Sequence, residues 1–173
     1  MNYKYLDLEN KDNIIEGIIL RKLIIHKDQT GSLVETLRSD WQDVLSTTMP
    51  FKMQYMSITP PSIARDEDQW HVHKSQKDRF ICVSGQIVTA VFDAREKSPT
   101  KGNLNLFKMG PENENEMYMI IIPEGTYHGF MVVSSQNGYL LNFPTQIYNP
   151  ADEGRVKNGG QLNWQKVRED LGI

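Results

Sequence analysis

The sequence has little cysteine, no long apolar run and no excess of one charge, and each shortage excludes a class of protein. A single cysteine, Cys82, excludes a disulfide framework and a four-cysteine zinc site. The longest apolar stretches, such as residues 117–123, are far shorter than the roughly 20 residues of a membrane-spanning helix. Nineteen Lys and Arg against 22 Asp and Glu give a net charge of −3 without charged blocks, so neither nucleic acid nor a membrane is an expected partner.

The chain starts without the basic and apolar regions of a secretion signal, which predicts a cytoplasmic protein. Its 173 residues are enough for a single domain, residues 1–173, that buries a full core. Cys82 lies within the apolar residues 80–83, and no basic residue adjoins it to stabilise a thiolate. A buried, unreactive thiol is therefore predicted.

Short β-prone runs separated by turn residues are abundant. They cover residues 14–25, 33–37, 52–59, 70–73, 79–83, 86–93, 104–108, 116–122, 127–133 and 138–143. This spacing predicts an all-β sandwich or barrel. The alternation in residues 86–92 is typical of strands that turn one face to a core and the other to a lumen.

Helical patterning is weak and confined to two segments. Residues 37–45 form a short candidate helix, and residues 163–171 carry apolar side chains at helical spacing, with Asn163 as N-cap and Gly172 at the stop. Residues 149–154 are predicted to end the β region before this helical tail.

Three histidines and one aspartate stand at spacings that suggest a shared site. His71 and His73 are two apart, so in a strand their imidazoles project from the same face. Asp78 follows on the same segment, and His128 follows the turn at residues 123–126. The arrangement resembles the two cupin motifs, His-x-His-x(3,4)-Glu-x(6)-Gly and Pro-x-Gly-x-x-His, with Asp78 at the glutamate position. Two interpretations stay open: one divalent transition metal ion bound by these four residues, or a metal-free polar lumen.

A wider resemblance covers residues 28–35, 91–102, 122–130 and 144–150. The pattern D-x-R-x-x-S-P-T-x-G followed by I-P-x-G-x-x-H-G-F resembles the dTDP-4-dehydrorhamnose 3,5-epimerase family. The resemblance implies a cupin jelly-roll barrel, a homodimer, no cofactor, and an isomerase that moves protons at C3 and C5 of a dTDP-4-keto-6-deoxyhexose. Residues 53–56, rich in Met and aromatic side chains, are a candidate apolar interface.

The resemblance also implies roles for individual residues. Proton abstraction beside a ketone needs a base and a group that meets the enolate oxygen. His71 aligns with the histidine of the family motif R-G-L-H-x-Q and is the predicted base, whereas Arg79 aligns with a family lysine near the keto oxygen. The remaining implied positions are catalytic His128 and substrate-binding Glu35, His73, Asn142 and Tyr148.

One position departs from the family pattern. Asn142 stands where the family has the tyrosine that returns the proton, and an amide cannot donate in this way. The function predicted is therefore a 3,5-epimerase-like activity that is single-centre or diverged, with Tyr139, Tyr127 or Tyr148 as substitute acids. The alternatives are a metal-dependent small cupin, either an enzyme or a carbohydrate-binding module, and an inactive relative that binds a sugar nucleotide. Arg95 is predicted to be a structural ion-pair partner.

Overall fold

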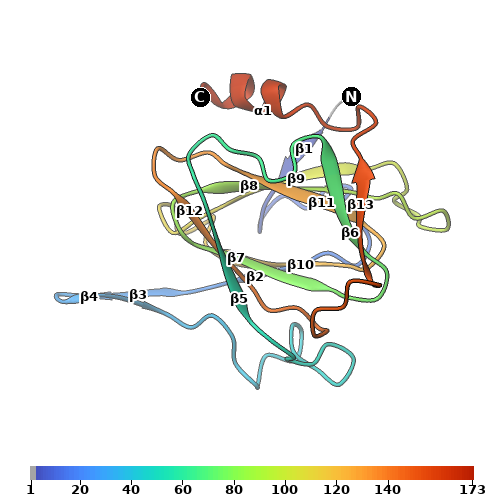
Figure 1. The fold of residues 1–173 in the computed structure, drawn as a ribbon. Coiled ribbons are helices and arrows are strands. Elements are labelled where there is room, and N and C mark those ends of the chain that lie inside the picture. Colours follow the sequence, from blue (N-terminus) through green and yellow to red (C-terminus); the bar gives the residue numbers. More distant parts are fainter. Residues whose placement is uncertain (1–2) are drawn as a thin grey trace.

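The computed structural model describes residues 3–173, which contain thirteen strands and one helix; two facing sheets, of six and five strands, make up the barrel (Figure 1). The six-stranded sheet has the order β1 (Lys4–Leu6), β9 (Leu104–Met109), β8 (Ile87–Phe92), β11 (Tyr127–Val132), β6 (Gln69–His73) and β13 (Glu153–Lys157). The five-stranded sheet has the order β2 (Ile19–Lys22), β10 (Tyr118–Ile122), β7 (Asp78–Ser84), β12 (Gly138–Asn142) and β5 (Tyr55–Thr59). The jelly-roll barrel and the all-β class are confirmed.

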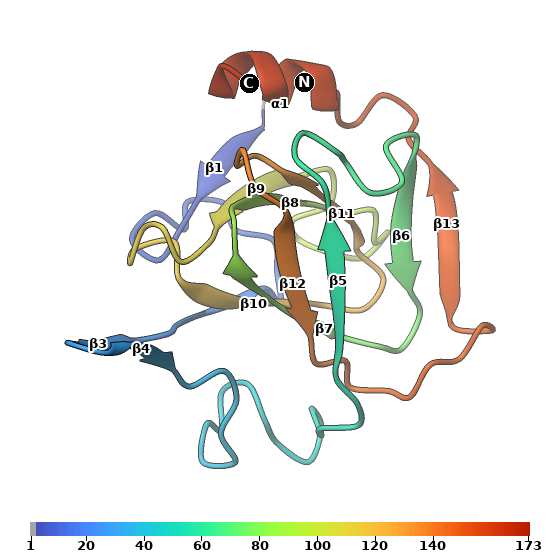
Figure 2. The same cartoon turned by 60° about the vertical axis from the view of Figure 1, so that its left-hand side comes forward.

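A separate hairpin of β3 (Ile25–Asp28) and β4 (Gly31–Val34) projects away from the two sheets (Figure 2). At its tip the Asp28 carboxylate accepts hydrogen bonds from the backbone N–H groups of Thr30 and Gly31. These bonds close the turn between β3 and β4.

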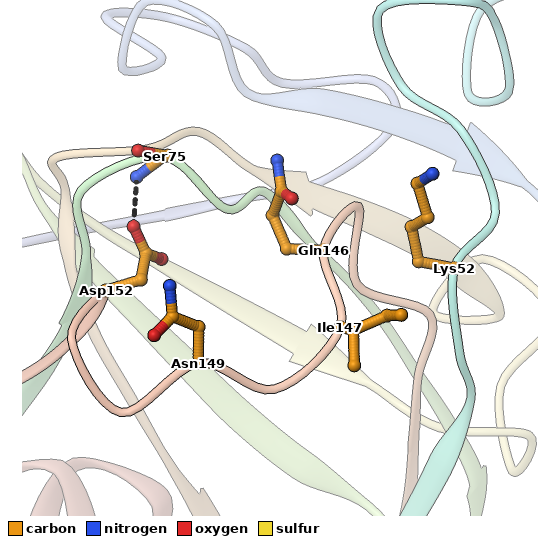
Figure 3. Close-up of a pocket in the computed structure, with 6 residues that line it drawn as sticks. All are labelled: Lys52, Ser75, Gln146, Ile147, Asn149 and Asp152. Carbon is orange, nitrogen blue, oxygen red and sulfur yellow. Dashed lines mark hydrogen bonds between the residues drawn. The ribbon is translucent and has the colours of Figure 1, made fainter.

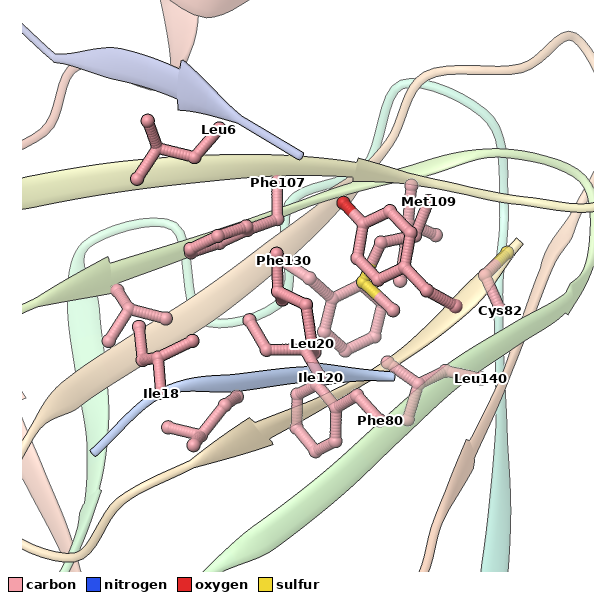
Figure 4. Close-up of a cluster of buried hydrophobic side chains, with 14 of the residues drawn as sticks. Leu6, Ile18, Leu20, Phe80, Cys82, Phe107, Met109, Ile120, Phe130 and Leu140 are labelled. Atoms are coloured by element: carbon pink, nitrogen blue, oxygen red, sulfur yellow. The ribbon is translucent and has the colours of Figure 1, made fainter. Parts of the chain in front are cut away.

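Strand alternation places the buried residues of the five-stranded sheet on its two faces. In β10, Ile120 and Ile122 point into the space between the sheets, whereas Met119 and Ile121 point to the outer face of the five-stranded sheet. Both faces exclude water, which explains why this strand is apolar throughout. Between the sheets, Phe80, Phe107 and Phe130 belong to the largest apolar cluster (Figure 4).

The predicted helix over residues 37–45 is wrong. The segment forms turns, with the backbone N–H groups of Val44 and Leu45 both bonded to the carbonyl of Trp41. Its apolar side chains pack on the outer face of the five-stranded sheet, with Val44 fully buried there. Tertiary burial therefore accounts for the apolar pattern that resembled a helix.

The C-terminal segment contains the predicted helix and a strand, β13 (Glu153–Lys157), that was not predicted. Helix α1 (Trp164–Leu171) begins at Asn163, whose side chain accepts from the N–H of Lys166, and ends at Gly172 with a φ of 71°. The prediction that the β region ends at residues 149–154 is wrong, because β13 pairs with β6 along its whole length. In residues 3–173 no helix has the length and apolar character needed to cross a bilayer.

The motif D-x-R-x-x-S-P-T-x-G is a hydrogen-bonded turn around a buried carboxylate. Asp93 accepts from Arg95 Nε at 2.8 Å, from Ser98 Oγ at 2.5 Å and from Thr100 Oγ1 at 2.6 Å. Arg95 also donates to the carbonyl of Glu16. Arg95 is thus the structural ion-pair partner that the sequence predicts. Cys82 is likewise buried, and burial raises the pKa of its thiol to about 12.

Candidate active site

Three imidazoles meet in the space between the sheets, beside the apolar cluster. His71 and His73 project from the same face of β6, and His128 of β11 lies directly opposite His71 in the antiparallel pair. The ring centroids of His71 and His73 are 4.7 Å apart, and those of His71 and His128 are 5.3 Å apart. The N–H of Gly125 donates to the carbonyl of His73, which ties the turn before His128 to the end of β6.

Asp78 enters the same cluster from the opposite sheet. Its Oδ2 lies 3.2 Å from His128 Nε2 and 3.5 Å from His73 Nε2, and its side chain is almost fully buried. Burial opposes ionisation, but His128, His73 and the Asn142 amide lower the pKa of Asp78 to about 2. The cluster therefore contains a carboxylate at neutral pH.

Two further acidic residues contact the histidines, one in β13 and one directly before it; sequence analysis did not predict this strand. Glu153 Oε1 of β13 lies 3.3 Å from His71 Nε2, and Asp152 Oδ2, one residue earlier, lies 3.3 Å from His73 Nδ1. Gln76 completes this shell, with its Nε2 at 2.8 Å from Asp78 Oδ1. No local pattern indicates the contacts of Glu153 and Asp152, since these depend on the pairing of β13 with β6.

His71 has the electrostatic character of an unprotonated base. Burial, and then the charges of His128, Arg155 and His73, lower its pKa to about 3. The imidazole is neutral at physiological pH and has a lone pair ready to accept a proton. Its side chain remains 26% exposed, so that a small molecule can reach it.

Three cavities surround the cluster. One of about 120 Å³ is lined by Tyr55, His71, His128, Arg65 and Arg155, among others. A second cavity, of about 280 Å³, is also lined by His71 and extends to Asn149. A third, of about 370 Å³, also touches that asparagine and is lined by Lys52, Gln146 and Asp152 (Figure 3). Neighbouring cavities share lining residues, and the polar one carries one positive and one negative side chain, Lys52 and Asp152.

Asn142 makes every hydrogen bond that an amide can make here. Its Oδ1 accepts from the N–H of Arg79 at 3.0 Å, and its Nδ2 donates to Asp78 Oδ1 and to the Tyr55 hydroxyl, both at 2.8 Å. The residue is fully buried. It joins β7, β12 and β5 at the floor of the site. Tyr55 is a site residue that sequence analysis did not nominate.

Arg79 does not join the cluster, so its predicted role at the keto oxygen is wrong. Its guanidinium donates to the carbonyl of Val44 at 2.7 Å, to that of Phe143 at 2.6 Å and to that of Met49. These atoms lie on the outer face of the sheet. Because Asp78 points inward, the two-residue period of a strand sends Arg79 the other way, a signal already present in the sequence.

The other nominated residues lie at different places. Tyr148 lines the 280 Å³ cavity at its rim and is 65% exposed. Glu35 pairs with Arg38 and lines none of the three cavities. Tyr139 precedes the inward-facing Leu140 in β12, so its side chain points to the outer face. Tyr127 packs against the apolar cluster between the six-stranded sheet and α1. The substitute acids Tyr139 and Tyr127 therefore point away from the histidines.

The donor set could also hold a metal ion. One ligand atom from each of His71, His73 and His128 lies within 4.8 Å of the other two. Among the described residues, neither ring nitrogen of His128 makes a well-aligned hydrogen bond. Imidazole and carboxylate ligands suit several divalent transition metals.

A family model and a curated relative both relate this chain to sugar epimerases. A family model described as dTDP-4-dehydrorhamnose 3,5-epimerase matches residues 12–167. The chain is 37% identical over 145 residues to the probable low-salt glycan biosynthesis epimerase Agl13 of Haloferax volcanii, covering 82% of this chain and 87% of that protein.

Two solved structures share the fold. A dTDP sugar isomerase from Desulfovibrio desulfuricans G20 matches with a TM-score of 0.78 and 23% identity, over 87% of this chain and 92% of that chain. ChmJ, a 3'-monoepimerase from Streptomyces bikiniensis in complex with dTDP-quinovose, matches with a TM-score of 0.72 and 22% identity, over 92% of this chain and 75% of that chain.

Proposed function

The protein belongs to the dTDP-4-dehydrorhamnose 3,5-epimerase family, and on that premise we propose that it inverts a carbon beside the keto group of a dTDP-4-keto-6-deoxyhexose. The observation that carries the proposal is the position of His71, whose imidazole lines two cavities between the sheets. His71 takes the proton from C3 or C5, and an enolate forms. A positioned base of this kind contributes roughly 10²–10⁴-fold in rate.

The developing oxyanion needs a cation or donor, and Arg79 cannot provide it. Arg65 and Arg155 line the same cavity as His71 and carry N–H donors there, with Arg155 also paired to Asp66 and Glu153. His128 offers a ring nitrogen to the same space. These three groups take the role that the sequence resemblance gave to Arg79.

The ligand is proposed to extend from His71 along the adjoining cavities. The sugar lies in the 280 Å³ cavity, where Tyr148 and His73 contact it. Asn149 borders both this cavity and the polar one, which Lys52 also lines (Figure 3). The diphosphate is proposed to lie in the polar cavity, beside Lys52. Electrostatic attraction between the ammonium and the phosphates supports this direction.

The reaction proposed needs no cofactor, since acid–base groups suffice for it. The four-residue donor set of His71, His73, Asp78 and His128 favours one second candidate, a divalent transition metal ion at the same place. A metal there would occupy the lone pair of His71, so the two candidates exclude each other at this residue.

A homodimer is proposed from the edge of the five-stranded sheet. Within residues 3–173, strand β5 has a partner on one side only, and it exposes Met56 and Ile58, at 51% and 48%. Unpaired apolar edges are usually covered in native proteins. Sedimentation should give about 40 kDa, twice the 20.0 kDa chain, at tens of micromolar. A cytoplasmic location remains a prediction.

The function is tested by incubating the protein with dTDP-4-keto-6-deoxyglucose in deuterated water. Deuterium should enter C3 or C5, and an epimer should accumulate. Folded protein that exchanges no proton with any 4-keto nucleotide sugar would contradict the proposal and favour the metal-binding candidate.

A further inference from the structure

The amide at position 142 fixes the orientation of a neighbouring phenol. Both N–H bonds of Asn142 Nδ2 are used, one on Asp78 and one on Tyr55, and its Oδ1 is held by a backbone N–H. The amide therefore cannot turn over without losing hydrogen bonds. As a result, the Tyr55 oxygen is an acceptor in this contact.

Because the Tyr55 oxygen accepts from Asn142, its own proton is free to point elsewhere. Within residues 3–173 the Tyr55 hydroxyl donates to no protein group. The ring is 40% exposed, and it lines both cavities that His71 lines. The phenolic proton is thus free to turn toward the space where a ligand would lie.

Tyr55 and His71 approach that space from opposite sides. Tyr55 belongs to β5 of the five-stranded sheet, and His71 belongs to β6 of the six-stranded sheet. Inversion of a carbon requires that a proton leave from one face and return to the other. A base and an acid on facing sheets satisfy this geometric demand.

We propose that Tyr55 is the general acid of this site and donates to the face of the sugar opposite His71. The proposal rests on the epimerase function above. In the step, the Tyr55 O–H bond breaks and a C–H bond forms at the enolate carbon, while the oxyanion returns to a ketone. The tyrosinate then takes a proton from solvent, and His71 releases to solvent the proton it removed.

The electrostatic surroundings keep the phenol protonated between turnovers. Burial and the negative charge of Asp78 raise the pKa of Tyr55 to about 12, although the Asn142 hydrogen bond acts in the opposite direction. Tyr55 therefore holds its proton at neutral pH and can serve as a donor.

The decisive variant is Tyr55→Phe, which removes one hydroxyl and retains the ring. Two rates are measured on a dTDP-4-keto-6-deoxyhexose in deuterated water: deuterium entry at the reacting carbon, and formation of the inverted epimer. Inversion should fall roughly 10²–10⁴-fold. Exchange with retained configuration should continue, because His71 still removes the proton and returns deuterium to the same face.

The matched control is Tyr139→Phe, which removes a hydroxyl from a ring that faces away from the histidines. It should leave both rates within about twofold of wild type, and both variants should melt close to the wild-type temperature. Unchanged inversion in Tyr55→Phe would overturn the proposal. Equal loss of exchange and inversion would also overturn it, since a donor acting after abstraction is not needed for exchange. A wild-type protein without any exchange would instead count against the epimerase function itself.

Discussion

His128 of β11 lies directly opposite His71 of β6, and the two rings are stacked with 5.3 Å between centroids. This pairing puts one imidazole beside another in a buried space and contributes to the lowered pKa of His71. Burial of His71 is the larger cause of the lowered pKa, and the His128 charge adds to it.

Replacing His71 by Asn should abolish proton exchange while preserving the fold. The side chain is a quarter exposed and makes no well-aligned hydrogen bond through Nε2, so little packing is lost. The exchange rate should fall roughly 10²–10⁴-fold. Unchanged turnover, with an unchanged melting temperature, would remove His71 from the mechanism.

Replacing Arg79 by Met should affect stability more than catalysis. The change leaves the carbonyls of Val44 and Phe143 without donors, and each unsatisfied buried group costs about 1–3 kcal/mol. Denaturant titration should show this loss, and turnover below the melting temperature should change little. A stable variant that has lost turnover would restore the oxyanion role predicted from the sequence.

Asp93→Asn should lower the free energy of unfolding by about 3–5 kcal/mol, because Arg95 loses its buried partner. The wild-type protein should also lose stability in acid. Burial raises the Asp93 pKa, but hydrogen bonds from Arg95, Ser98 and Thr100 hold it below its usual range. A lowered folded-state pKa stabilises the protein above the unfolded value of about 4, and this contribution is lost as pH falls further.

The contribution of the Asp93 carboxylate is measured by comparing the acid dependence of unfolding in wild type and in Asp93→Asn. Urea titrations between pH 7 and pH 2 should show a steeper decline below about pH 4 in wild type than in Asp93→Asn. Equal slopes in the two proteins would mean that Asp93 is not held ionised by the turn.

Asn142→Tyr should not create a better enzyme. The residue is fully buried and holds Asp78 and Tyr55 through its amide. A ring at this position overpacks the floor at a cost of about 1–3 kcal/mol and releases Tyr55. Melting temperature and inversion rate should both fall, and a faster inversion would show that the acid belongs on β12.

Metal content separates the two candidate uses of the histidine cluster. The epimerase mechanism predicts no more than about a tenth of an equivalent of transition metal after saturation and desalting, and turnover insensitive to a chelator. Mass spectrometry of the metal content checks the first point. About one equivalent that is lost in a His73→Ala, Asp78→Ala double variant would favour the metal site instead.

The sequence by itself determined the elements whose signals are local. Each of the ten β-prone runs overlaps a strand, although residues 33–37 share only two residues with β4, because alternation and turn residues act within a few positions. Asn163 and Gly172 were enough to place both ends of α1. The two-residue period placed His71 beside His73, and the long motifs indicated the family that the comparisons confirm.

Only the tertiary structure decided which distant groups meet. β13 has little apolar character of its own and exists because β6 offers a free edge, so Glu153 and Asp152 could not be assigned to the histidines beforehand. Residues 37–45 form turns and not a helix, because their apolar side chains are buried against the five-stranded sheet. Tyr55 lies 87 positions from Asn142, and no pattern along the chain links them. Their contact follows from the pairing of β5 with β12, since strand neighbours are chosen by how the whole barrel closes.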